Sequence, residues 1–410
     1  MPAQRRTAPT LSRASQQWVL DWVIQETGKV FHFQTDGRGG LPRSVRSHAM
    51  ISKHLGLAAR RFQRLAEEEK AVGHRVTALA RYFEAALLFA NAQHVIFENN
   101  AEKRLLHQAS IRSYDQVREL APYRIEHIDI DWQGGTASGN LHLCPGDSAA
   151  PCVFFVPGCD QTKEMYPHPL LNHAHQRGMH VFSFDGPGQG ECNLRGIKLT
   201  PINYEQAAAA AIDYLVNRPE IDANQIVVYG ISFGSYWALR IAAYDQRVRA
   251  VAAPWSSLCE KYHLMDEDVP RFKQLFRYLT DAKSEADLDR IMAAMSLKAI
   301  LPKITCPTLT AVGEYDPRSP LDEVEELFDS IGGPAELWVF ADQHHRLSLT
   351  RPNAEMIPWL MDTHEMAIDW LGDRLGGKAL TNERKAVYLQ PGGGGPYSET
   401  RSHKRVWYDH

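Results

Sequence analysis

Residues 225–240 read QIVVYGISFGSYWALR, an apolar run followed by a serine between two glycines and then by a segment typical of a helix. Gly230-Ile231-Ser232-Phe233-Gly234 fits the G-x-S-x-G pattern, and a strand before it with a helix after it is the setting in which this pattern forms a nucleophile elbow. Such a turn is so tight that the serine takes a strained backbone conformation and its neighbours must be small. A chance match on a surface turn would lack the flanking strand and helix. We therefore predict that Ser232 is a nucleophile.

Continuous apolar runs, bounded by glycine and proline, recur on both sides of this motif. We expect strands at 152–157, 180–184, 225–229, 248–252, 308–312 and 337–340, preceded by a pair of strands at 124–132 and 137–144. Helix-like segments lie at 172–177, 204–217, 237–244, 321–331 and 354–375. Strands that are apolar throughout are typical of a parallel sheet buried on both faces. The alternation predicts an α/β fold, and the elbow predicts the α/β-hydrolase fold.

Three further regions flank or interrupt this α/β pattern. Residues 1–121 are expected to form a helical N-terminal domain, since apolar residues recur there at steps of three and four and Gly and Pro are rare after residue 44. Residues 122–375 form the predicted hydrolase domain. Within it, 255–304 has no strand pattern and is predicted to be a helical cap insertion. The glycine-rich residues 376–410 are expected to be a weakly packed C-terminal extension.

The composition excludes several functional classes. The chain of 410 residues has 45 basic and 49 acidic side chains, so its net charge of −4 gives no overall field for nucleic acid or an anionic membrane. The basic residues near the C-terminus (Arg401, Lys404 and Arg405), together with Trp407, are too few to indicate a nucleic-acid site. No apolar run is long enough to span a bilayer, and no secretory signal is expected. Six cysteines without a CxxC pair indicate reduced thiols in the cytoplasm and give no support for a zinc site. No other metal and no cofactor are expected.

A serine nucleophile needs a base and an acid, which follow it in the chain order serine, acid, histidine in this fold. The expected strand 308–312 runs into Gly313-Glu314-Tyr315-Asp316. A carboxylate just past the end of this strand faces the same crevice as the elbow, so Asp316 is the predicted acid. Glu314 is the alternative, and Asp322 is expected to be a solvated charge in the first turn of a helix.

The last expected strand, 337–340, runs into Ala341-Asp342-Gln343-His344-His345, and one histidine of this pair is the predicted base. A loop of about four residues is needed to bring an imidazole over the serine, which favours His345 over His344. The other histidine is expected to line the site. Adjacent histidines point apart, so the pair does not indicate a metal site.

The developing oxyanion needs two backbone N–H groups. The residue after the nucleophile, Phe233, supplies one, and we expect the other from Cys159 in the loop that follows strand 152–157. The Cys159 thiol is more simply interpreted as a buried structural group than as a nucleophile. The glycine-rich residues 184–191 lack the pattern of a phosphate-binding loop and are predicted to form a tight turn beneath the site.

Two segments carry a family resemblance: HVFSFDGPGQGE at 180–191 and GCDQTKE at 158–164. They resemble the α/β-hydrolase subgroup of 2,6-dihydroxypseudooxynicotine hydrolase and the fungal polyketide-shortening hydrolases, to which the respiration-switch proteins are also similar. The resemblance runs from about residue 43 to residue 375. It implies hydrolysis of a carbon–carbon bond in an aryl or polyketide ketone by Ser232, Asp316 and His345, a helical domain over the active site, and a homodimer. Ser235 stands where many relatives have a second glycine.

Carbon–carbon cleavage of a ketone releases a carbanion, which must be delocalised and protonated. His345, once protonated, can supply that proton. Glu260 and Asp266 in the cap are candidates to orient the ketone, or they are surface charges. Trp255 is expected to form an aromatic wall for the substrate, or it belongs to the core.

Two alternatives to this ketone hydrolase remain open. The first is a carboxylesterase that uses the same triad on a small-molecule ester. The second is a non-catalytic binding or regulatory protein on a hydrolase scaffold.

Overall fold

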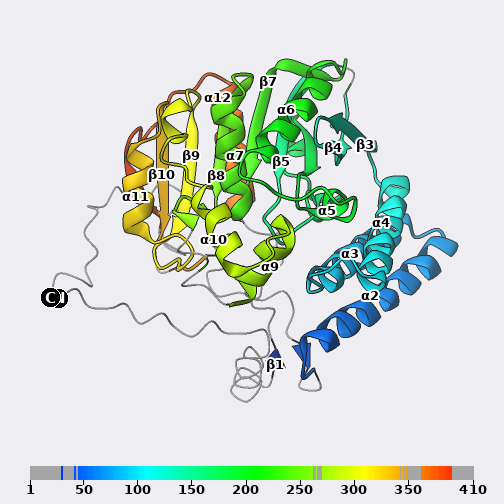
Figure 1. The fold of residues 1–410 in the computed structure, drawn as a ribbon. Helices are drawn as coiled ribbons and strands as arrows, with labels where there is room; N and C mark the ends of the chain where they lie inside the picture. The colour runs from blue at the N-terminus through cyan, green and yellow to red at the C-terminus, as the bar shows by residue number, and fades with distance from the viewer. Residues whose placement is uncertain are drawn as a thin grey trace, which may run out of the picture.

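The computed structural model describes residues 29–30, 41–42, 45–146, 148–261, 265, 270–341, 343–345, 347–348 and 362–389. A nine-stranded sheet forms the centre, with the strand order β11-β10-β9-β8-β7-β5-β6-β4-β3 (Figure 1). Its strands are β3 (Ile125–Trp132), β4 (Gly135–His142), β5 (Ala150–Val156), β6 (His180–Asp185), β7 (Ile221–Gly230), β8 (Val248–Pro254), β9 (Thr308–Gly313), β10 (Ala335–Phe340) and β11 (Ala386–Leu389). The pairs from β6 to β11 are parallel, and β4 pairs antiparallel with β6 and with β3. The predicted α/β-hydrolase fold is confirmed.

The strands are apolar throughout because both faces of the sheet are covered. Phe154 and Val156 of β5 point into a core shared with α6 (Asn203–Val216), α7 (Phe233–Tyr244) and α11 (Leu321–Asp329). Val153 and Phe155 of the same strand point into a second core shared with α12 (Asp362–Leu375). Alternate side chains of one strand therefore stabilise opposite faces of the sheet.

The expectation that residues 376–410 are weakly packed is wrong for one segment. Ala386–Leu389 forms β11, which is buried and pairs in parallel with β10, with Leu337 opposite Ala386. Four apolar residues in the sequence AVYL are enough to pair with the free side of β10, but so short a run gives little periodic signal. The sheet therefore extends one strand beyond the predicted hydrolase domain.

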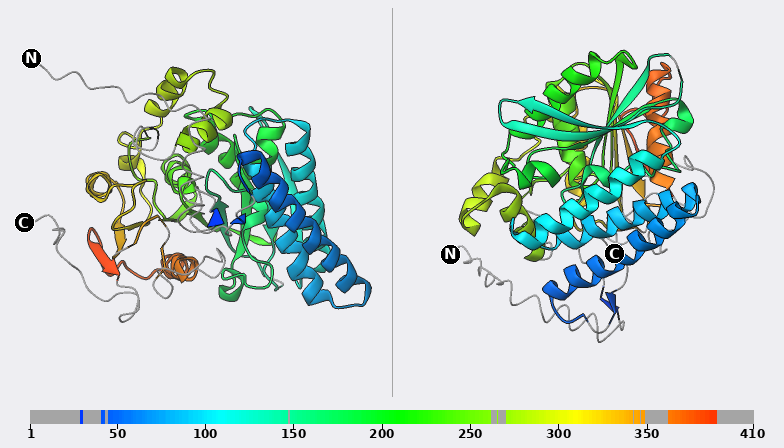
Figure 2. Two further views of the ribbon diagram at one scale, coloured as in Figure 1. Left: turned by 90° about the horizontal axis from the view of Figure 1, so that it is seen from below. Right: turned by 90° about the vertical axis from the view of Figure 1, so that its right-hand side faces the viewer.

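The helices near the N-terminus lie side by side on one flank of the sheet (Figures 1 and 2). They are α2 (His48–Ala71), α3 (Arg75–His94) and α4 (Ala101–Leu120), and α3 packs against both of the others. A short antiparallel pair, β1 (Lys29–Val30) and β2 (Leu41–Pro42), precedes them. Asn100 caps α4, since its side chain accepts a hydrogen bond from the Lys103 N–H over 2.9 Å. Tyr114 of α4 links this layer to the sheet, since its hydroxyl lies 3.1 Å from Nε2 of His142.

The described part of residues 255–304 contains helices and no strand. They are α9 (Pro270–Thr280), α10 (Glu285–Ala293) and the 3₁₀ turn η4 (Leu301–Lys303). This predicted cap meets the loop between α3 and α4 at Tyr278, whose hydroxyl donates to Oδ1 of Asn99 over 2.6 Å. Shorter turns complete the fold: η2 (Lys163–Met165), η3 (His175–Arg177) and α5 (Gly190–Leu194). Among the described residues, no helix has the length and apolar character needed to cross a bilayer.

Candidate active site

The elbow places Ser232 on a strained turn between β7 and α7. Its backbone has φ 53° and ψ −129°, a conformation that non-glycine residues rarely adopt. A Cβ on Gly230 would lie 2.3 Å from the carbonyl oxygen of Gly234, and one on Gly234 would lie 2.3 Å from the carbonyl oxygen of Val156. Both contacts are with backbone atoms, so the turn requires glycine at both positions.

Ser232, His345 and Asp316 form a continuous series of hydrogen bonds. Oγ of Ser232 lies 2.8 Å from Nε2 of His345, and Nδ1 of His345 lies 2.7 Å from Oδ2 of Asp316. Because the carboxylate can only accept, the proton of a neutral imidazole is on Nδ1, and Nε2 is left to accept from the serine hydroxyl. The arrangement has the geometry of a nucleophile, a base and an orienting acid.

The loops that carry the acid and the histidine are tied to each other. The Tyr315 N–H donates to the carbonyl oxygen of Gln343 over 2.9 Å. The Gln343 side chain closes its own loop, with bonds of 2.7 Å to both the N–H and the carbonyl oxygen of Ser348. The Arg318 N–H donates to Oδ1 of Asp316 over 2.9 Å, so both oxygens of this buried carboxylate are bonded. Nothing in the sequence identified Gln343, because its role depends on the loop conformation.

The alternatives for acid and base lie elsewhere. The His344 ring is exposed, and its Nδ1 lies 2.9 Å from the carbonyl oxygen of Tyr315. Asp322 is exposed in the first turn of α11. The Glu314 backbone N–H donates to the carbonyl oxygen of Phe340 over 3.0 Å. The structure therefore brings His345 and Asp316, rather than these residues, to Ser232.

The expected oxyanion donors come from two segments that meet at Ser232. Phe233 is the first residue of α7, so its N–H belongs to the end of the helix where N–H groups have no intrahelical acceptor. Cys159 follows β5, and a Cβ on the preceding Gly158 would lie 3.3 Å from Cβ of Ser232. The Cys159 side chain is buried. A pocket beside this loop is bordered by His94 and Lys103 of the N-terminal helices and by Tyr278 of the cap.

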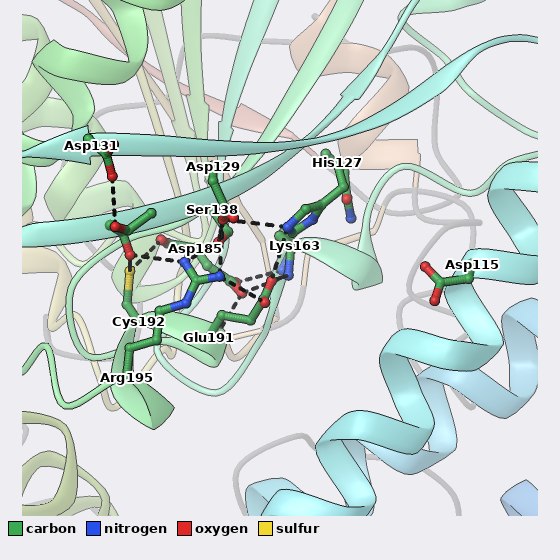
Figure 3. A network of polar contacts seen from close by, with 12 residues as sticks. Asp115, His127, Asp129, Asp131, Ser138, Lys163, Asp185, Glu191, Cys192 and Arg195 are labelled. Carbon is green, nitrogen blue, oxygen red and sulfur yellow. Dashed lines mark hydrogen bonds and ion pairs between the residues drawn. The ribbon is translucent and has the colours of Figure 1, made fainter.

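A buried ionic cluster lies where the loop after Cys159 meets the glycine-rich turn (Figure 3). Nζ of Lys163 is 2.6 Å from carboxylate oxygens of both Glu164 and Glu191, and 3.3 Å from Oδ2 of Asp185. The three carboxylates offer oxygens within 4.8 Å of one another, which is the spacing of a metal site. The Lys163 ammonium lies among them and supplies the positive charge.

Burial and charge act against each other in this cluster. Burial alone would lower the pKa of Lys163, but the three carboxylates together hold that pKa well above its ordinary value. Burial raises the pKa of Asp185 to about 6, although the Lys163 charge opposes the rise. The glycine-rich turn is thus joined to the loop after Cys159 by buried ion pairs. These residues belong to the two segments that carry the family resemblance, but the sequence alone does not show that their side chains meet.

Trp255 and Glu260, the expected substrate-binding residues, have different surroundings. Trp255 has φ 54° and 7% exposure, and its ring centroid lies 6.4 Å from that of His345. Its indole N–H has no hydrogen-bond partner among the described residues. The Glu260 carboxylate accepts from the Ser296 hydroxyl over 2.9 Å and lies 3.8 Å from Nζ of Lys298, contacts that hold the cap together. Asp266 lies outside the described residues.

Ser235 has a structural contact of its own. Its hydroxyl accepts the Ser257 N–H over 2.6 Å, which joins α7 to the start of the cap. A glycine at this position would lack that bond.

Comparison with known proteins identifies the family. A family model described as "Esterase FrsA-like" matches residues 57–335. The chain belongs to the FrsA-like family. The family resemblance seen in the sequence is thereby confirmed, and the chain is an α/β-hydrolase enzyme.

Individual known proteins match over most of the chain. The 2,6-dihydropseudooxynicotine hydrolase of Paenarthrobacter nicotinovorans is 30% identical, over 74% of this chain and 82% of that one. Hydrolase LUC6 of Fusarium sp is 29% identical, over 75% of this chain and 86% of that one. The crystal structure of the 2,6-dihydroxy-pseudo-oxynicotine hydrolase superposes with a TM-score of 0.71, covering 89% of this chain and 97% of that one at 24% identity. That structural match supports the fold.

Proposed function

We propose that this protein is a serine hydrolase that cleaves a carbon–carbon bond in a β-diketone-like, acyl-aromatic or polyketide ketone. Its catalytic triad is Ser232, His345 and Asp316. The observation that carries the proposal is the pair of hydrogen bonds, 2.8 Å and 2.7 Å, that joins these three side chains at a strained elbow.

The reaction begins when Nε2 of His345 accepts the proton of the Ser232 hydroxyl and Oγ attacks the ketone carbonyl carbon. The carbonyl oxygen becomes an oxyanion that accepts from the N–H groups of Cys159 and Phe233. When the carbonyl re-forms, the bond to the neighbouring carbon breaks and its electron pair leaves as a delocalised carbanion. Protonated His345 gives that carbanion its proton. A water, activated by His345, then hydrolyses the acyl-enzyme and releases a carboxylic acid.

Two observations favour a ketone with an aromatic or polyketide framework. One relative is named for 2,6-dihydropseudooxynicotine, and another is named 20-hydroxy-prefusarin hydrolase. In this chain the indole of Trp255 lies beside His345, where it offers an apolar face and an N–H to such a substrate. The helical domain 1–121 and the cap 255–304 are proposed to cover the substrate, since Tyr278 joins them beside the Cys159 loop.

A substrate panel tests the reaction type. Purified protein is offered an acyl-phenol diketone beside p-nitrophenyl esters, with Ser232→Ala as the control. Diketone cleavage that falls by at least about 10⁴-fold in Ser232→Ala supports the proposal. Fast ester turnover without diketone cleavage would instead make the protein a carboxylesterase, in keeping with the family description.

Covalent labelling tests for a binding or regulatory protein. A fluorophosphonate should label the native chain and leave Ser232→Ala unlabelled. A native chain that does not label would favour the non-catalytic alternative.

We also propose that the protein is a cytoplasmic homodimer that works without a metal or cofactor and binds neither nucleic acid nor membranes. The six cysteines are free thiols, which supports a reducing compartment. On α2 and at the residue that follows it, the side chains of Leu57, Leu65 and Val72 are 56%, 44% and 67% exposed at steps of eight and seven residues. Light scattering tests the dimer, and Leu57→Asp with Leu65→Asp should yield a monomer if this stripe is the contact.

A further inference from the structure

We propose that Gln189 is a positioning residue for the oxyanion hole. Together with the Gln161 N–H, it fixes the orientation of the peptide bond that carries the Cys159 N–H. The inference rests on the role proposed above for that N–H, and it gives a purpose to the glycine-rich turn that the mechanism does not otherwise use.

The Gln189 side chain is 2% exposed, and both ends of its amide are bonded. Nε2 donates to the carbonyl oxygen of Gly158 over 2.8 Å and to that of Pro157 over 3.3 Å. Oε1 accepts from the Tyr204 hydroxyl over 2.7 Å. Because the two backbone carbonyls can only accept, the NH₂ group must face them. The hydroxyl on the opposite side then meets the amide oxygen.

The carbonyl of Gly158 and the N–H of Cys159 belong to one peptide bond. A trans peptide is planar, and its C=O and N–H point in opposite directions. A hydrogen bond that fixes the direction of the carbonyl therefore fixes the direction of the N–H. This peptide borders the nucleophile, since the position of a Cβ on Gly158 is 3.3 Å from Cβ of Ser232.

The loop has no helix or strand between β5 and η2. Within it, the Gly158 carbonyl also accepts the Gln161 N–H over 3.0 Å, and the Gly158 N–H donates to Oε1 of Gln161 over 3.0 Å. Gln189 adds the bond that joins this turn to the rest of the protein.

The far end of the loop is held in a similar way, with the Lys163 N–H donating to Oδ1 of Asp185 over 2.8 Å. Asp185 and Gln189 therefore hold the loop from one turn, at its two ends. Tyr204, which orients the Gln189 amide, stacks on Trp237 of α7 at 4.2 Å and 4°. Through Tyr204, Gln189 is therefore held against α7, the helix that follows the elbow.

Gln189→Glu is the discriminating variant. It keeps the shape of the side chain and the acceptor for Tyr204, but the carboxylate cannot donate to the Gly158 carbonyl. We expect kcat to fall by about 10- to 100-fold on whichever ester or ketone is turned over, with KM within about twofold, because loss of a whole oxyanion donor costs about 10²–10³. Tyr204→Phe, which leaves the amide present but less fixed, should lower kcat by a smaller factor.

The matched control is Gln246→Glu. Gln246 is exposed in the turn after α7. Among the described residues its side chain accepts from the Thr305 hydroxyl and donates to none, so the same change should leave kcat unchanged. Thermal unfolding of each variant shows whether a loss of kcat comes from misfolding. If Gln189→Glu does not fold, Tyr204→Phe carries the kinetic test.

A spectroscopic measurement separates this inference from the proposed function. Labelling with ¹⁵N-cysteine gives a spectrum of the six cysteine amides. The Cys159 signal should move in Gln189→Glu, while those of Cys144, Cys152, Cys259 and Cys306 stay in place. Cys192 is not used as a reference, because it lies in the short helix that Gln189 precedes. This measurement needs no turnover, so it stands even if Ser232→Ala shows that Ser232 is not the nucleophile. An unmoved Cys159 signal with unchanged kcat would overturn the inference, and so would a rise in KM at constant kcat.

Discussion

Replacing Asp316 by asparagine tests the orienting role of this carboxylate. Oδ1 accepts the Arg318 N–H over 2.9 Å and Oδ2 faces Nδ1 of His345 over 2.7 Å. In Asp316→Asn, the Arg318 N–H still needs an acceptor, so the amide oxygen takes the Oδ1 position. The amide NH₂ is then directed at His345.

That exchange changes the tautomer of the neutral imidazole. An NH₂ group donates, so Nδ1 must accept, and the proton of neutral His345 moves to Nε2. The nitrogen that faces Ser232 at 2.8 Å can then no longer accept the serine proton. A wrong tautomer of this kind costs about 10⁴-fold in kcat, or about 5 kcal/mol of transition-state stabilisation.

The assay is kcat on the best substrate of the panel, together with the rate of fluorophosphonate labelling. Both should fall by about 10⁴-fold while the unfolding temperature changes little, because size and hydrogen bonding to Arg318 are retained. Asp322→Asn, on the exposed first turn of α11, is the matched control and should behave as the native chain. Asp316→Asn activity within tenfold of the native value would refute the reasoning.

Other changes test the neighbouring features. His345→Gln should lower kcat by at least about 10⁴-fold and His344→Gln by less than about threefold, and equal losses would show that the exposed ring also takes part. Gly234→Ala should lower both the unfolding temperature and kcat, the latter by about 100-fold, because a Cβ 2.3 Å from a backbone oxygen must displace the elbow; a native-like variant would contradict this. Burial lowers the pKa of Lys103 to about 7, so above that pH the unfolded chain holds a proton that the folded chain lacks. The free energy of unfolding of the native chain minus that of Lys103→Met should therefore rise by up to about 1.4 kcal/mol per pH unit between about pH 7 and about pH 9. Urea unfolding measures this difference, and a difference that does not change with pH would show that Lys103 keeps its proton on folding.

Those parts of the fold that depend on local pattern could be predicted from the sequence. The continuous apolar strands and the elbow around Ser232 each carry their signal within about ten residues. The approach of His345 rather than His344 depends on a loop held by Gln343, and adjacent residues of the same type cannot be separated by pattern alone. The Lys163 cluster joins segments more than twenty residues apart, so it becomes visible only when the sheet has brought them together.

The short strand β11 has a practical consequence for any shortened version of the chain. It covers the backbone of β10 from Leu337 to Phe340, and a chain cut after α12 would leave those N–H and carbonyl groups open along an apolar border. Open borders of this kind recruit strands from other molecules. Expression designs that end at residue 375 should therefore aggregate, whereas designs that retain residues 376–389 keep the border closed.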